Sequence, residues 1–244
     1  RKIVKILFVR GNPRPNGVCA LLGGRFLEGL QAAGAQVLDF DLREKKVGDC
    51  RGCFACSVGF DRRGKCVQTD DMAQALDFLD SADALVCLTP VYFYSMSAQL
   101  KRFFDRCFPF VRGYEFDESD GKMRNATQFL EPRKKFVSIG VSSGLSEDVF
   151  GGLTATFATI ADSMNFEYSA NITRGESAYF LVDNRSVRVR RVAEAFSRAG
   201  REFAETGAIT PETLAETVAP FSRGKKSFAA NAQVFWKLRH SGRI

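Results

Sequence analysis

Histidine is almost absent from this sequence of 244 residues, and the one copy, His240, lies close to the end. This scarcity excludes Ser-His-Asp and Cys-His catalysis in the body of the fold, two-histidine zinc sites and the HExxH motif. Apolar runs of 18 or more residues are also lacking, so no transmembrane segment is expected. The opening RKIVKILFV is strand-like and lacks the apolar core and cleavage site of a secretory signal. Any chemistry here therefore depends on groups other than imidazole.

Acidic residues are missing from the last part of the chain. The net charge is +7, but Phe221 to Ile244 contains six basic residues and no acidic one, so the rest is nearly neutral. Phe221, Phe228 and Phe235 lie seven apart, which in a helix forms one aromatic stripe. We expect this tail to dock on its own or a partner subunit, with an anionic membrane surface or an acidic partner as the alternative. No nucleic-acid motif accompanies it, so nucleic-acid binding is not expected.

The seven cysteines are unevenly placed. Four lie close together, at Cys50, Cys53, Cys56 and Cys66. An odd number with one dense group favours a reducing, cytoplasmic environment and ligand or redox thiols over a disulfide framework. In C-x2-C-x2-C-x9-C, three thiolates can hold three corners of a cubane cluster and a fourth can close it. Zinc or free thiols stay open as alternatives, although zinc more often uses two separate C-x2-C pairs.

Apolar runs alternate with helical patterns along most of the chain. Strands are predicted at 2–9, 35–42, 83–89, 134–141 and 165–172. Helical patterns follow each strand, one of them with Thr69 as its N-cap and another over 147–163. This order predicts one doubly wound α/β domain with a five-stranded parallel sheet over residues 1–210. A cysteine segment (43–68) and a polar excursion (110–132) interrupt it, and a basic, aromatic tail (211–244) follows.

Three loops fall at the carboxyl ends of strands, where ligands bind in such folds. GNPRPNG (11–17) leads into a helix start whose amides suit a phosphate, with Arg14 as a charged partner; a plain surface turn is the alternative. It matches neither GxGxxG nor GxxxxGK[ST], which excludes the dinucleotide-binding and P-loop motifs. The loop 89–98 offers a proline and three aromatics that can wall a flat ring, although such a run by itself more often forms core. The third loop, 142–144, is a turn of small residues.

GNPRPNG, the cysteine segment followed by TDDM, and TPVYFYSMSAQLKRFFDR together resemble the NAD(P)H-dependent FMN reductase branch of the flavodoxin-like proteins, and more narrowly its iron–sulfur flavoproteins. The similarity spans about residues 3–206 and is most specific over 89–106. It implies an FMN site whose phosphate is lined by Asn12, Arg14, Asn16, Val18 and Cys19. It also implies flavin contacts from Pro90, Val91, Tyr92, Phe93 and Ser95, with Ser142 and Gly144 at the other edge of the ring.

The first loop departs from the usual family pattern GSPR…GNT. Asn12 replaces the serine, and Val18-Cys19 replaces Asn-Thr. A cysteine at a helix start tends toward the thiolate, which repels a phosphate. We therefore expect Cys19 to weaken FMN retention.

The resemblance implies an oxidoreductase in which FMN accepts hydride from NAD(P)H. Electrons then pass singly through a [4Fe–4S] cluster on Cys50, Cys53, Cys56 and Cys66 to a ferredoxin-like or small-molecule acceptor. The cofactors carry the chemistry, so no side chain is expected to act as an acid or base. A cluster-free reductase of quinones, nitro compounds or flavins, an electron carrier that does not use nicotinamide, and a zinc-stapled binding module stay open. Electron transfer between subunits would require an oligomer, so we expect a homodimer or homotetramer. In it, the segment 110–132 of one subunit could cover the flavin of its neighbour.

Overall fold

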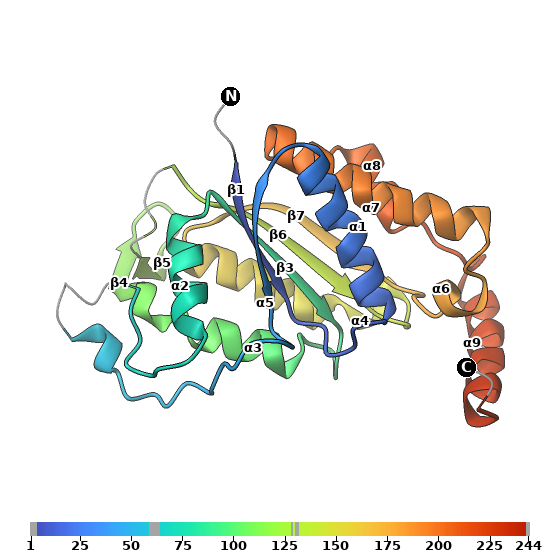
Figure 1. Ribbon diagram of the computed structural model, residues 1–244, viewed down its shortest axis with the longest axis horizontal. Helices are drawn as coiled ribbons and strands as arrows, with labels where there is room; N and C mark the ends of the chain where they lie inside the picture. Colours follow the sequence, from blue (N-terminus) through green and yellow to red (C-terminus); the bar gives the residue numbers. More distant parts are fainter. Residues whose placement is uncertain (1–3, 59–63, 128, 130–131, 243–244) are drawn as a thin grey trace.

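A five-stranded parallel sheet lies at the centre of the protein, with helices on both faces (Figure 1). The computed structural model describes residues 4–58, 64–127, 129 and 132–242. The strand order is β2-β1-β3-β6-β7. The strands are β1 (Lys5–Arg10), β2 (Gln36–Asp41), β3 (Ala84–Pro90), β6 (Lys135–Val141) and β7 (Glu167–Arg174). The predicted doubly wound α/β fold is thereby confirmed.

The three central strands are continuous apolar runs because helices cover them on both sides. In β1, β3 and β6 nearly every side chain is buried, whereas the edge strand β2 buries only its last two residues. Because β1, β3 and β6 are parallel neighbours, the three loops that follow them lie next to one another.

Five helices form the two outer layers of the domain. One layer contains α1 (Val18–Ala32) and α7 (Val187–Thr206); the other contains α2 (Met72–Ser81), α3 (Ala98–Asp105) and α5 (Gly151–Ser163). Helices α1 and α7 cross at two glycines. A Cβ on Gly29 would lie 1.8 Å from the carbonyl oxygen of Ser197, and one on Gly200 would lie 2.1 Å from that of Phe26. Only glycine at these positions allows the two backbones to touch.

Two details of the helices differ from the sequence prediction. The helix expected over 147–163 is divided into α4 (Ser146–Val149) and α5, because the ring of Phe150 turns inward and packs against Gly140. The prediction of Thr69 as an N-cap is wrong. Asp71 occupies that position in α2, and the carboxylate of Asp70 accepts a hydrogen bond from the Met72 amide at 3.1 Å.

The excursion at 110–132 contains an antiparallel hairpin, β4 (Val111–Asp117) and β5 (Lys122–Thr127), after the short 3-10 helix η3 (Phe108–Phe110). Arg124 binds Asp117 at 2.8 Å within the hairpin and Asp162 of α5 at 3.1 Å. The hairpin therefore lies against α5, on the side of the molecule opposite to the C-terminal helix (Figure 1).

The tail forms α8 (Pro211–Thr217) and α9 (Lys225–His240), and a buried ion pair fixes the segment between them. Arg174 and Glu176, at the end of β7, are 1 % and 3 % exposed and their charged groups lie 3.5 Å apart. The Glu176 carboxylate accepts the backbone N–H groups of Phe221 at 2.8 Å and Ser222 at 2.9 Å. The Arg174 guanidinium lies 4.5 Å from the centre of the Phe221 ring. In the part of the chain that the structure describes, no helix has both the length and the apolar character needed to cross a bilayer.

Candidate functional site

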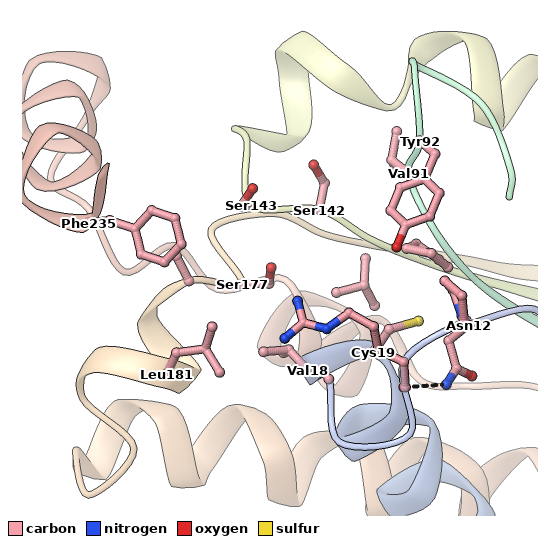
Figure 2. Close-up of a pocket in the computed structure, with 16 residues that line it drawn as sticks. Asn12, Val18, Cys19, Val91, Tyr92, Ser142, Ser143, Ser177, Leu181 and Phe235 are labelled. Carbon is pink, nitrogen blue, oxygen red and sulfur yellow. Dashed lines mark hydrogen bonds between the residues drawn. The ribbon is translucent and has the colours of Figure 1, made fainter. Parts of the chain in front are cut away.

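Three loops meet around one open cavity of about 210 Å³ at the carboxyl edge of the sheet (Figure 2). They follow β1, β3 and β6, which are parallel neighbours, so their ends come together. Eight of the residues expected to contact a cofactor line this cavity: Asn12, Arg14, Val18, Cys19, Pro90, Val91, Tyr92 and Ser142.

Four expected residues are not among those that line it: Asn16, Phe93, Ser95 and Gly144. Phe93 is fully exposed, because it and Tyr94 adopt positive φ angles of 48° and 66° in a tight turn. Ser95 closes that turn through two backbone hydrogen bonds with Tyr92, at 2.9 and 3.1 Å. Asn16 is exposed, and Gly144 lines a neighbouring cavity instead.

Several lining residues come from elements that the sequence interpretation did not include. Ser177, Ala178 and Leu181 belong to the segment after β7 and to the short helix α6 (Tyr179–Val182). Phe235 extends from α9 toward the cavity (Figure 2). The position of β7 beside β6 could have indicated the first group, since its carboxyl end lies at the same edge. No local sequence signal indicates that Phe235 lies here.

The start of α1 presents backbone amides at the cavity. Its N-cap residue is Gly17, which has no side chain to cap the helix, and the first turn contains no acidic residue. Asn12 is 1 % exposed; its Nδ2 donates to the carbonyl oxygen of Arg14 at 3.1 Å, and its Oδ1 has no partner among the described residues. An uncapped helix start beside a basic residue is suited to an anion such as a phosphate.

Ser97 connects the first loop to the second. Its hydroxyl donates to the carbonyl oxygen of Gly11 at 2.6 Å, and its backbone N–H donates to Thr89 Oγ1 at 2.9 Å. The same hydroxyl caps α3 by accepting the N–H of Leu100 at 3.3 Å. A Cβ on Gly11 would lie 2.7 Å from that of Leu100, so this close approach requires glycine.

The expectation of a thiolate at Cys19 is wrong. Its side chain is only 8 % exposed, and burial raises the pKa of the thiol far above its ordinary value. Removing the sulfur from water disfavours the charged thiolate relative to the neutral thiol. Cys19 is therefore a neutral thiol at pH 7 and does not repel a phosphate.

The cysteines at 50, 53, 56 and 66 line a second, smaller cavity of about 100 Å³. The segment bends at Gly52 and Phe54, with φ angles of 60° and 53°, and then forms the 3-10 helix η1 (Ala55–Ser57). Burial raises the pKa of Cys56, and the nearby thiols of Cys66 and Cys53 add to that increase. Within the described ranges, no three His, Cys, Asp or Glu side chains are arranged to hold one metal ion.

Arg106, just after α3, also lines the cysteine cavity. Burial lowers the pKa of Arg106, but its hydrogen bond with Asp70, the charges of Cys66 and Asp70 and a contact with the Cys66 sulfur raise it overall. Asp70 in turn accepts the N–H of Gly48 at 2.9 Å. These bonds hold the two ends of the cysteine segment together.

Solved structures with a similar fold include flavoproteins. An azoreductase from Bacillus anthracis superposes with a TM-score of 0.60 at 15 % identity, covering 83 % of this chain and 99 % of its own. An FMN-dependent NADH-azoreductase from the same species, solved in complex with FMN, has a TM-score of 0.62 at 14 % identity over 83 % and 100 % of the two chains. At these identities the likeness shows the fold alone.

Relatives by sequence are similar over about half of the chain. An iron-sulfur flavoprotein of Archaeoglobus fulgidus is 32 % identical over 107 residues, or 44 % of this chain and 47 % of its own. Another, of Methanocaldococcus jannaschii, is 32 % identical over 118 residues, or 48 % and 59 %. The chain thus matches about half the length of these curated relatives. The family model for NADPH-dependent FMN reductases matches residues 4–127, which include β1, β3 and the loops after them, and the chain therefore belongs to this family.

Proposed function

We propose that the protein is an NAD(P)H-dependent oxidoreductase that binds FMN in the cavity beyond β1, β3 and β6. The observation that carries this proposal is the meeting of an uncapped helix start with three loops at a single cavity. When bound, FMN supplies hydride acceptance from a nicotinamide and the release of electrons one at a time.

The residues of the chain would bind and orient this cofactor. The amides at the start of α1 and the guanidinium of Arg14 would hold the phosphate. Tyr92 and Val91 would contact the ring from one side, and Ser142 would lie at its other edge. Phe235 narrows the cavity from the α9 side and would exclude water. Asn16, Phe93, Ser95 and Gly144 lie outside the cavity lining, so we assign them no direct contact.

We further propose a [4Fe–4S] cluster on Cys50, Cys53, Cys56 and Cys66. Four thiols around one small cavity, beside a buried guanidinium, are a suitable donor set for an anionic cluster. Zinc with bonds of about 2.3 Å needs its sulfurs to converge more tightly than a cubane does. The names of the relatives point the same way. Seven free cysteines also support a reducing compartment such as the cytoplasm.

The two cavities lie at opposite ends of α3. Ser97 precedes the helix beside the first cavity, and Arg106 follows it at the second. Eight helical residues extend about 12 Å, so α3 separates the two sites within one copy of the chain. We further propose that the cluster exchanges electrons with a ferredoxin-like or small-molecule acceptor, or with the flavin of another copy in a homodimer or homotetramer.

The test is anaerobic purification with added FMN, followed by absorption spectra before and after NADH or NADPH. We expect flavin bands that bleach on addition of the nicotinamide. Replacing Arg14 with Ala should weaken FMN binding by about 1.5–3 kcal/mol, roughly 10- to 150-fold, because a charge-assisted phosphate contact is lost. Arg25→Ala is the matched control, since Arg25 lies on α1 but pairs with Glu28 at the surface. Protein that is colourless after excess FMN has been added and the unbound FMN removed would refute the proposal. So would an equal loss of FMN affinity in the Arg14 and Arg25 variants.

A cluster-free reductase is the second candidate, because the described cysteines share a cavity without converging on one point. Iron and acid-labile sulfide in the anaerobic protein distinguish the two candidates. Flavin that binds but does not bleach with either nicotinamide would instead indicate an electron carrier.

A further inference from the structure

Arg106 is a charged side chain in an almost completely buried position. Only 1 % of it is exposed, and it follows the apolar face of α3 that contains Leu100 and Phe103. A buried charge is costly unless it is paired and hydrogen-bonded. The contacts of its three nitrogen atoms therefore indicate why an arginine is placed here.

Two of the three nitrogens donate hydrogen bonds. Nη1 donates to Asp70 Oδ2 at 2.7 Å and to the carbonyl oxygen of Gly48 at 2.9 Å, and Nη2 donates to Asp70 Oδ1 at 3.0 Å. Asp70 is itself held by the amides of Gly48 and Met72. This bidentate pair fixes the plane of the guanidinium, so Arg106 cannot turn away from the cysteine cavity.

The third nitrogen, Nε, is buried and has no hydrogen-bond partner among the described residues. Arg106 and Cys66 both line the cysteine cavity. A buried N–H donor without a partner costs about 1–3 kcal/mol, and native proteins rarely leave one unsatisfied. An acceptor that occupies this cavity would remove the penalty.

We propose that Arg106 donates its Nε–H to the Cys66 sulfur when Cys66 ligates the cluster, and so favours the reduced cluster over the oxidised one. Arg106 is a positioning residue, and this inference rests on the proposed cluster. The reduced cluster carries one more negative charge, so a fixed donor at a ligating sulfur stabilises it more. Asp70 holds the donor in place through the opposite edge of the guanidinium.

Arg102 provides a matched control on the same helix. Its Nε donates to Asp49 at 2.7 Å, but its side chain is 38 % exposed and does not line the cysteine cavity. Both arginines pair with a carboxylate beside the cysteine segment. Of the two, only Arg106 lines the cysteine cavity and has a buried N–H without a partner among the described residues.

The first experiment compares Arg106→Lys with Arg102→Lys in the FMN-loaded protein with its cluster assembled. Lysine keeps the charge and can keep the pair with Asp70, but it lacks the Nε–H. EPR-monitored titration of wild type and both variants should show a more negative midpoint in Arg106→Lys alone. A tenfold fall in the ratio of reduced to oxidised cluster at fixed potential equals about 59 mV for one electron. Equal midpoints in all three proteins would overturn the inference.

A second measurement applies if Arg106→Lys fails to assemble a cluster. Wild-type protein grown with arginine labelled by ¹⁵N only in its guanidinium should show a nitrogen coupled to the reduced cluster in pulsed EPR. The coupling should persist in Arg51→Lys, which removes an exposed guanidinium from the same cavity lining. A cluster without that coupling overturns the role of Arg106 but leaves the proposed function intact. Wild-type protein without iron and sulfide overturns both the role of Arg106 and the proposed cluster, and leaves the cluster-free reductase.

Discussion

The buried pair of Arg174 and Glu176 gives the sharpest stability prediction. Glu176→Ala removes the carboxylate that accepts the amides of Phe221 and Ser222. It also leaves Arg174, 1 % exposed, as a buried charge without its carboxylate. Removing one partner of a buried ion pair costs about 3–5 kcal/mol. The two orphaned amides can hydrate as the tail loosens, so we expect the same range, about 3–5 kcal/mol, for the whole substitution.

Urea denaturation followed by circular dichroism measures this loss, with Glu216→Ala as the control. Glu216 also pairs with arginines, Arg191 at 2.8 Å and Arg198, but it lies at the surface, where ion pairs contribute little. The control should therefore leave the midpoint almost unchanged. Combining Glu176→Ala with Arg174→Met should recover part of the lost stability, because the unpaired charge is then gone. Equal midpoints for the two single variants would refute the reasoning.

Three further predictions concern the helix crossing and the cysteine segment. Gly29→Ala should lower the unfolding free energy by about 1–3 kcal/mol or more, because its Cβ would enter the α7 backbone. Gly24→Ala is the control: outside its own stretch of helix, an added Cβ meets no described atom within 4 Å, so this variant should gain about 0.5–1 kcal/mol. A neutral Gly29 variant contradicts the crossing. Burial of the Asp70 carboxyl opposes the hydrogen bond from Arg106 but does not cancel it, and the pKa of Asp70 is lowered below 3.8. The stability advantage of the wild type over Asp70→Asn should therefore be full above pH 3.8 and disappear as the pH falls through the lower pKa of the folded state. A difference in urea midpoint that stays constant with pH is the opposing result. Cys53→Ser should abolish iron binding and retain flavin, as measured by metal analysis and absorption, and loss of both would mean that the two cavities are not independent.

Much of the fold is predictable because the central strands are apolar throughout. The run from Ile6 to Val9 is entirely buried, and such a run between turn residues has one common interpretation. The hairpin β4–β5 was not predicted, since its apolar residues Tyr114, Phe116 and Met123 are exposed and give no buried face. The break at Phe150 also escapes local reasoning, because the packing of its ring against Gly140 depends on a distant strand.

The candidate site is predictable where it follows strand ends and less so elsewhere. Asn12, Arg14 and Tyr92 follow strands β1 and β3, so topology alone brings them together. Phe235 comes from the C-terminal helix, and only tertiary docking places it here. Arg106 did carry a signal: it lies three residues after Phe103, so helical spacing continues the buried face to this position, where an arginine needs a partner.

The hydroxyl of Ser97 has a consequence for how tightly a ligand is held. By bonding to Gly11 while its own amide bonds to Thr89, it gives two adjoining loops their shape before anything binds. A ligand entering here does not have to immobilise the chain, so little of its binding energy is spent on ordering. Ser97→Ala would release that constraint, and the resulting loss of affinity would be entropic in origin although the serine touches no ligand.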